Sequence, residues 1–140
     1  MCLLSLHTEP YLTLALDCDN KWLYADWQAV QTPQTVEAGC QLILRYTQEE
    51  KCCKLLNDST SVQGTWSVVT EWVNNGYFDK LAMVGVRKLA WVHSENCFSR
   101  YTTDYVLQQV SNPVAAAFND LPGAYIWLQQ SQIASYLRAS

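Results

Sequence analysis

The segment KLLNDSTSVQGTWS, residues 54–67, gives the strongest indication of fold in this chain. It begins with a short, largely apolar run, Lys54–Asn57, and continues with mostly polar residues before a helical pattern starts. That order predicts a strand, a loop and the beginning of a helix. In parallel α/β proteins the carboxyl end of a strand is where ligands and partners are usually held. The segment is therefore the first candidate for a functional surface.

Two segments nearer the N-terminus, residues 11–17 and 21–28, alternate between apolar and polar side chains. A period of two residues is typical of strands with one buried face, and the polar cluster at residues 17–20 suits a turn between them. The two segments are predicted to form an antiparallel hairpin. The alternating apolar residues are Leu12, Leu14, Leu16, Leu23, Ala25 and Trp27.

Three shorter runs, residues 54–57, 89–93 and 114–118, are continuously apolar, as expected of parallel strands that are covered on both faces. Helical patterns separate them and follow the last one. The fold class predicted is α/β, with a mixed five-stranded sheet (an N-terminal antiparallel hairpin plus parallel βαβ units) and about four helices. The predicted helices span 33–49, about 66–73 with a short continuation at 77–84, 102–109, and a final stretch that Asp120 caps.

The length of 140 residues and the 49% hydrophobic content suffice for one core and are too small for two domains. We expect a single domain at residues 11–128. Residues 1–10 are predicted to be an N-terminal tail, and residues 129–140 a C-terminal helix extension or tail.

The charge pattern argues against two classes of partner. Nine basic and 13 acidic residues give a net charge of −4, and no run of Lys or Arg could neutralise a series of phosphates, so nucleic acid binding is not expected. The first residues lack the pattern of a secretory signal, and no apolar segment is long enough to span a bilayer. The sequence therefore predicts a cytoplasmic protein without membrane insertion.

The six cysteines show no C-x-x-C spacing and accompany no export signal, so reduced thiols are the simpler interpretation. The adjacent Cys52 and Cys53 could form a redox or metal site, but neighbouring residues reach disulfide geometry poorly. We interpret them as small residues at a helix-to-strand junction and predict no metal and no cofactor. The cysteines are Cys2, Cys18, Cys40, Cys52, Cys53 and Cys97.

Several short motifs, taken together, resemble the STAS superfamily, which is also described as SpoIIAA-like or anti-sigma-factor-antagonist-like. The closer likeness is to a group of small uncharacterised bacterial proteins of that fold. The resemblance extends over nearly the whole chain and implies a STAS/SpoIIAA-like fold. The motifs are WLYADW at 22–27, KLLND at 54–58, GTW at 64–66, EWV at 71–73, AWV at 90–92 and FS at 98–99.

In the antagonist proteins, the helix after the equivalent strand starts with a hydroxyl that is phosphorylated, commonly in an Asp-Ser-Ser-Gly motif. That motif is absent here. The nearest hydroxyls by position are Thr65 and Ser67, and Asp58-Ser59 comes earlier. Trp66 is bulky where a kinase would need close approach, so the resemblance favours recognition over a phosphorylation switch.

Polar residues follow each predicted parallel strand, and such strands place their carboxyl ends at one edge of the sheet. Converging there, these residues could bind a polar ligand or support acid-base chemistry in a crevice containing Asp58, His93 and Asp120. The alternative is that they form caps and turns, with Asp120 capping the last helix and Asp58 holding its own loop. The group comprises Asn57, Asp58, Ser59, Thr60, His93, Ser94, Glu95, Asn119 and Asp120.

Trp22 and Tyr24 lie on the opposite face of their predicted strand from Leu23 and Trp27. If that face is open, two large aromatic side chains form a contact surface for a ligand or a second subunit. If both faces are covered, the aromatic side chains belong to the core.

The sequence thus predicts a non-enzymatic binding and regulatory module that recognises a protein partner, or a second copy as a homodimer, through the segment 57–67. The alternative is a small-ligand-binding or enzymatic domain that uses the crevice of Asp58, His93 and Asp120. A third prediction is a carrier of an apolar ligand. No catalytic residue is assigned.

Overall fold

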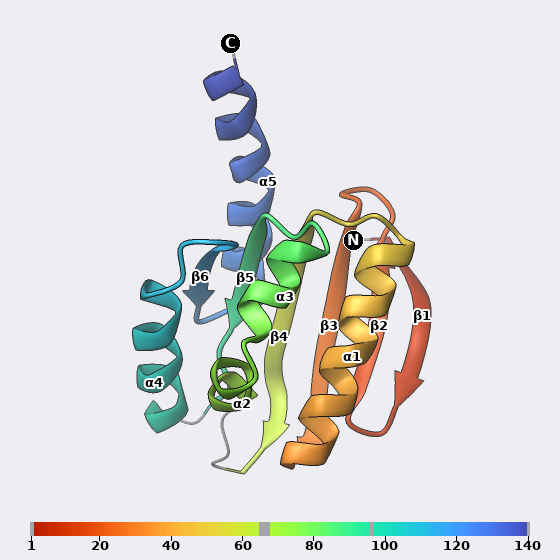
Figure 1. Cartoon of the computed structure of the whole chain (residues 1–140), viewed down its shortest axis with the longest axis vertical. Coiled ribbons are helices and arrows are strands. Elements are labelled where there is room, and N and C mark those ends of the chain that lie inside the picture. The colour runs from red at the N-terminus through yellow and green to blue at the C-terminus, as the bar shows by residue number, and fades with distance from the viewer. Residues whose placement is uncertain (1, 65–67, 96, 140) are drawn as a thin grey trace.

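A mixed sheet runs through the centre of the computed structural model, which describes residues 2–64, 68–95 and 97–139 (Figure 1). Its strands pair in the order of the chain, β1-β2-β3-β4-β5-β6. The first three strands are antiparallel to one another, and β3 to β6 are parallel. The strands are β1 (Leu3–Glu9), β2 (Leu12–Asp17), β3 (Trp22–Val30), β4 (Lys54–Gln63), β5 (Lys88–Val92) and β6 (Val114–Phe118).

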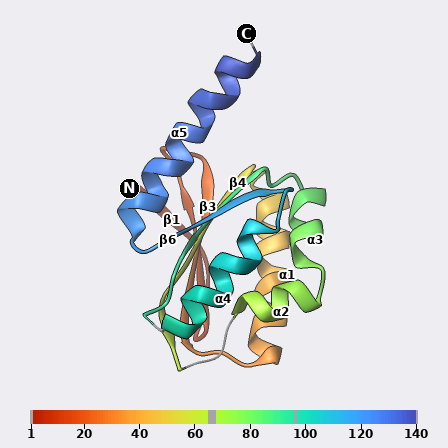
Figure 2. The same cartoon turned by 90° about the vertical axis from the view of Figure 1, so that its left-hand side faces the viewer.

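The helices divide unequally between the two faces of the sheet, as Figure 2 shows. Those that connect the parallel strands all lie on one face, and only the last helix covers the other. Each parallel strand joins the sheet on the same side of its predecessor, so right-handed crossovers place every connecting helix on one face. The helices are α1 (Pro33–Glu49), α2 (Val68–Asn74), α3 (Tyr77–Met83), α4 (Cys97–Gln108) and α5 (Leu121–Ala139).

The first helix begins and ends where the sequence predicts. The Thr32 hydroxyl accepts a hydrogen bond from the backbone N–H of Thr35, and the Thr35 hydroxyl accepts one from the backbone N–H of Thr32. Pro33 follows at the first helical position, where its missing N–H costs nothing. On the buried side, Gly39 lets α1 approach the Trp27 ring so closely that a Cβ there would lie 2.5 Å from the ring.

Two hydrophobic clusters lie on opposite faces of the sheet. The larger one fills the space between the sheet and α1 to α4, and includes Trp27, Trp72 and Trp91. The smaller one lies beneath α5 and includes Trp22, Leu56 and Leu128. At its border the buried ammonium of Lys54 donates a 2.6 Å hydrogen bond to the backbone oxygen of Leu128, which fastens α5 to β4.

The α/β class and the mixed sheet are confirmed, but the predicted number of strands and helices is wrong. Within the described residues the sheet has six strands rather than five, with five helices. The additional strand is β1, in the residues predicted to be a tail. It is an edge strand whose side chains are mostly exposed, so it lacks the alternating pattern that marks the next two strands. No helix in the described parts combines the length and apolar character that crossing a bilayer requires.

The predicted end of the fourth strand is also wrong, because β4 continues from Asn57 to Gln63. At the predicted end, Asn57 and Asp58 are held in the strand by hydrogen bonds from Trp27 and Tyr24, which lie far away in the sequence. The pairing of β3 with β4 shifts register after Asp26 and Asp58. There the Asp58 carboxylate accepts bonds from the Thr60 N–H (2.9 Å) and the Thr60 hydroxyl (2.7 Å). These local bonds hold the chain at the irregularity.

Candidate functional site

A chain of buried polar groups connects β3 to β4 on the face covered by α1 to α4. The Trp27 indole N–H donates a 2.7 Å hydrogen bond to the Asn57 side-chain oxygen. The Asn57 amide in turn donates a 3.3 Å bond to the Ser59 hydroxyl. All three side chains are buried. Their hydrogen-bonding groups are therefore engaged inside the protein rather than presented to a partner.

A second polar group lies on the opposite face of the same strands. The Tyr24 hydroxyl donates a 2.6 Å hydrogen bond to the Asp58 carboxylate. Burial raises the pKa of Tyr24 above its ordinary value, and the bond to Asp58 raises it further. Asp26 pairs with Asp58 in the strand register, and its pKa is raised by burial and, more weakly, by the Asp58 charge. The Asp58 carboxylate thus accepts hydrogen bonds from the Tyr24 hydroxyl and from Thr60.

The indole of Trp22 is enclosed beneath α5, where it meets the Tyr125 ring edge-on at a centroid distance of 5.1 Å. Tyr24 is partly buried next to it on the same face. Trp22 therefore belongs to the core below α5, and the two residues do not form an open aromatic surface.

His93 is buried just after β5, on the same face as Asn57. Its Nε2 lies 3.0 Å from a carboxylate oxygen of Asp104 in α4. Burial lowers the pKa of His93, although the Asp104 charge opposes that effect. Among the described residues its Nδ1 is buried without a hydrogen-bond partner. A histidine held by a carboxylate is a common arrangement for proton transfer, but this one is enclosed by the protein.

The three residues predicted to share a crevice point to different places. Asp58 bonds Tyr24 on the α5 face, whereas His93 bonds Asp104 on the α4 face. Asp120 is exposed, and its carboxylate accepts a 2.8 Å bond from the backbone N–H of Gly123, which is the capping role considered as the alternative. The structure therefore does not bring these three residues together.

The remaining predicted residues lie in the second half of β4 or follow it in the sequence. Thr60 is exposed. It lines a mostly polar hollow of about 570 Å³ together with residues 61–64 and Glu95. Thr65, Trp66 and Ser67, the residues nearest to the phosphorylated position of the antagonists, fall outside the described residues.

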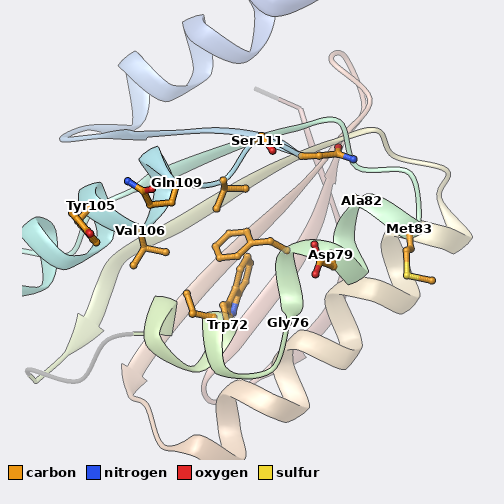
Figure 3. Close-up of a pocket in the computed structure, with 13 residues that line it drawn as sticks. Trp72, Gly76, Asp79, Ala82, Met83, Tyr105, Val106, Gln109 and Ser111 are labelled. Carbon is orange, nitrogen blue, oxygen red and sulfur yellow. The ribbon is translucent and has the colours of Figure 1, made fainter.

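A groove with a mixed apolar and polar lining, which the sequence did not indicate, lies between α2, α3 and α4 (Figure 3). Its volume is about 780 Å³. Trp72 and Phe78 form its floor, and both are buried. Trp72 is fixed by edge-on contacts with Phe78 and Trp91 at centroid distances of 5.5 and 5.1 Å. Trp72 therefore supports the groove from below, and only a small part of the Phe78 ring is accessible from it.

The rim of this groove, which we call the α3–α4 groove, exposes large apolar side chains to solvent. Val73, Met83 and Tyr105 are exposed to 47%, 85% and 62%. Asp79 adds a negative charge to the lining, and Gln109, Ser111 and Asn112 add polar groups at the α4 end. Met83 and Tyr105 fall within helices that the sequence predicts, but only the packing of those helices shows that they border a common groove.

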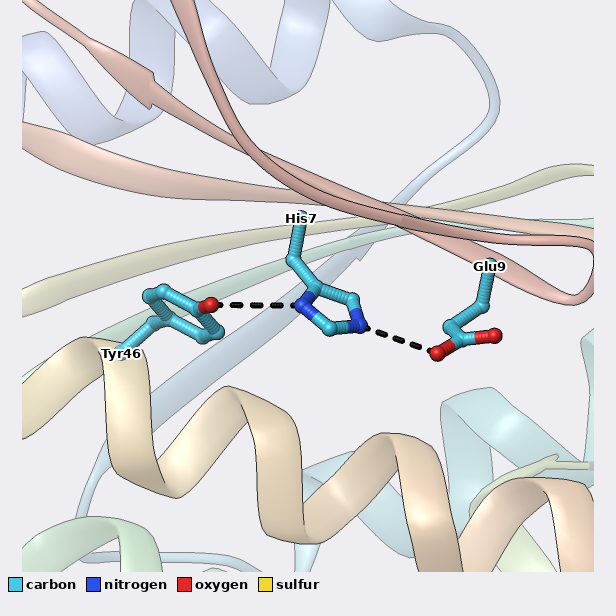
Figure 4. A network of polar contacts seen from close by, with 3 residues as sticks. All are labelled: His7, Glu9 and Tyr46. Atoms are coloured by element: carbon cyan, nitrogen blue, oxygen red, sulfur yellow. Dashed lines mark hydrogen bonds and ion pairs between the residues drawn. The ribbon is translucent and has the colours of Figure 1, made fainter.

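A further polar contact, which the sequence did not predict, joins β1 to α1 (Figure 4). His7 lies between the Tyr46 hydroxyl, 3.2 Å from Nδ1, and the Glu9 carboxylate, 3.0 Å from Nε2. His7 and Tyr46 also stack at a tilt, with centroids 5.7 Å apart. The cluster fastens the edge strand to the first helix.

The described residues contain no group of three or more histidine, cysteine or carboxylate side chains placed to hold a metal ion. Comparisons with protein-family models, with curated proteins and with solved structures gave no match.

Proposed function

We propose that this protein is a non-enzymatic binding module that recognises a protein partner through the α3–α4 groove. The observation that carries the proposal is the exposed apolar rim of Val73, Met83 and Tyr105 around a hollow that lies above the buried Trp72 and Phe78. Exposed apolar side chains that gather around a hollow are a feature of interaction sites. The regulatory role implied by the STAS-like resemblance belongs to this proposal, with the contact surface moved from segment 57–67 to the groove.

The rim favours a protein over a small molecule. Small-ligand sites enclose most of the ligand surface, whereas the Met83 side chain stands almost entirely in solvent. Methionine and tyrosine are side chains that protein interfaces use often, because one adapts its shape and the other offers a broad rigid surface. The apolar surface therefore extends beyond the volume that a small ligand would fill.

The form and charge of the groove define the partner segment. A groove between helices suits the apolar face of an amphipathic helix, whose side chains at i, i+3, i+4 and i+7 enter it. Asp79 lies in the lining, and the chain carries a net charge of −4. We infer that the partner helix has Lys or Arg beside its apolar face, where it meets Asp79.

The proposal can be tested with a photo-reactive amino acid placed at Met83 and, as a control, at Gln41, which is exposed on α1. After irradiation in cells, we expect one discrete protein adduct from position 83 and none from position 41. The cross-linked segment, made as a synthetic peptide, should be helical and bind the purified protein. Tyr105→Asp should weaken that binding at least about tenfold, about 1.4 kcal/mol, while Gln41→Asp leaves it unchanged.

Three results would contradict the proposal. The adducts could be the same at both positions, the adduct could be a lipid or another small molecule, or the peptide could bind Tyr105→Asp as well as the wild type. Circular dichroism of each variant confirms that the fold is retained.

A further inference from the structure

Cys2 and Cys18 face each other across the first two strands. The β1–β2 ladder begins with the pair Leu3 and Asp17. The backbone N–H of Cys18 donates a 2.9 Å hydrogen bond to the carbonyl oxygen of Cys2, so these two residues are the next pair in the register. Directly opposed residues that are hydrogen-bonded in an antiparallel ladder have Cα atoms about 5.5 Å apart, which is within the range that disulfides span.

Solvent reaches the thiols of both residues. Both cysteines are exposed. The pKa of the Cys18 thiol is raised by desolvation first, and then by its hydrogen bond to the Cys2 thiol and by the charges of Asp19 and Asp17. The Cys18 thiol also lies 3.8 Å from the backbone oxygen of Leu16, to which it donates. Two accessible thiols on directly opposed residues can therefore reach each other with a small local adjustment of the strand ends.

Three other cysteines, Cys40, Cys52 and Cys53, differ from this pair. Cys40 and Cys52 are buried, and burial raises the pKa of Cys52 to about 11. A buried thiol is out of reach of a peroxide, and this lack of access separates Cys40 and Cys52 from Cys2 and Cys18. Cys53 is exposed, but it follows Cys52 directly in the chain, where disulfide geometry is poor.

We propose that Cys2 and Cys18 form a reversible intramolecular disulfide when the protein meets a peroxide. In the first step the thiolate of one cysteine attacks a peroxide oxygen, the O–O bond breaks, and a sulfenic acid and hydroxide form. In the second step the other thiol attacks the sulfenic sulfur, the S–S bond forms and water leaves. Overall, two thiols are oxidised to a disulfide and one hydrogen peroxide is reduced to two waters.

The bond would fasten the edge strand. It joins the start of β1 to the turn between β2 and β3, so β1 could no longer separate from the sheet at that end. A hydrogen-bonded cross-strand pair holds its Cβ atoms farther apart than the mean disulfide does. The disulfide is therefore strained and easily reduced, as suits a reversible modification.

The test uses the purified full chain, reduced and then treated with a small excess of hydrogen peroxide. We expect the loss of two free thiols and of about 2 Da in intact mass, with the protein still monomeric on a non-reducing gel. Chymotryptic cleavage after Tyr11 separates Cys2 from Cys18, so the two peptides should stay joined until dithiothreitol is added. Cys53→Ser, the matched exposed control, should behave as the wild type, and Cys2→Ser and Cys18→Ser should each abolish the link.

The proposal is overturned if the joined peptides contain any other pair of cysteines, or if the link forms between two molecules. It is equally overturned if the reduced chain is oxidised to sulfinic acid at Cys2 or Cys18 without an S–S bond, or if Cys2→Ser loses two thiols as the wild type does. Cys2 and Cys18 are exposed, so neither substitution is expected to unfold the protein. Circular dichroism of each variant would detect a loss of fold.

Discussion

The Trp27 indole donates a 2.7 Å hydrogen bond to the Asn57 side chain at a position where both side chains are completely buried. The two residues lie on adjacent parallel strands and are separated by thirty positions in the chain. An amide in the middle of an apolar layer would be costly without such a partner. The bond explains why a buried strand can contain Asn57, and it fixes the Trp27 ring against α1.

The losses of stability caused by replacing Asn57 and Trp27 separately should sum to more than the loss caused by replacing both together. Asn57→Ala leaves the buried indole N–H without an acceptor, and we expect a loss of about 2–3 kcal/mol in the free energy of unfolding. In the double variant with Trp27→Phe, the two losses should fall short of additivity by about 0.5–3 kcal/mol. Urea unfolding of the wild type, the two single variants and the double variant measures the coupling. Strictly additive losses would show that the bond contributes nothing.

Gly39→Ala should destabilise the protein although alanine favours helices. By helix propensity alone the change would stabilise α1 by about 1 kcal/mol. The new Cβ would instead lie 2.5 Å from the Trp27 ring and 3.1 Å from Leu12, and overpacking of this kind costs about 1–3 kcal/mol. Thermal unfolding shows whether Gly39→Ala lowers or raises the stability of the fold. Gln41→Ala, an exposed position on the same helix, is the control, and we expect it to change stability by less than about 0.5 kcal/mol.

His93 should make the fold sensitive to acid. Its pKa in the folded protein is lowered by burial from the ordinary value of 6.5, so the unfolded chain binds the proton more readily. Its contribution is complete above pH 6.5 and is lost as the pH falls below that value. The loss cannot exceed about 1.4 kcal/mol per pH unit for one group. Chemical unfolding at a series of pH values should show this slope.

Two variants identify the residue responsible for that slope. His93→Gln should flatten the dependence of stability on pH below neutrality, because the ionisable group is gone. Asp104→Asn removes the charge that opposes the effect of burial, so the pKa of His93 falls further and the loss should continue to lower pH. If His93→Gln keeps the wild-type slope, other groups cause the acid sensitivity.

Periodicity in the sequence predicted most of the elements because their local signals agree with the fold. The hairpin of β2 and β3, the start of α1 at Pro33 and the run 114–118 of β6 lie where expected. The second half of β4 was missed for a tertiary reason. Asp58, the first residue beyond the predicted strand, accepts a hydrogen bond from Tyr24, which lies far away in the sequence. A window of local sequence cannot contain that information.

The sequence pattern predicted only part of the candidate site. His93 follows the carboxyl end of β5, as the order of elements predicts, whereas Asp58 lies in the middle of β4 because that strand continues to Gln63. Position along a strand does not assign the face, however, and successive residues point to opposite sides. The α3–α4 groove was not predicted because it depends on the distance between two packed helices. Met83 and Tyr105 are recognisable as neighbours on one groove only when the positions of these helices are known.

The order of the strands has a consequence for synthesis on the ribosome. Every strand pairs with the one made immediately before it, so most contacts join segments that leave the ribosome close together in time. Folding of this sheet can follow translation strand by strand, which keeps unpaired edges short-lived. The exception is the face beneath α5. Trp22, Leu56 and Ala90 remain uncovered until the last helix emerges. A nascent chain that stalls near residue 120 would therefore expose an apolar surface of the kind that chaperones bind.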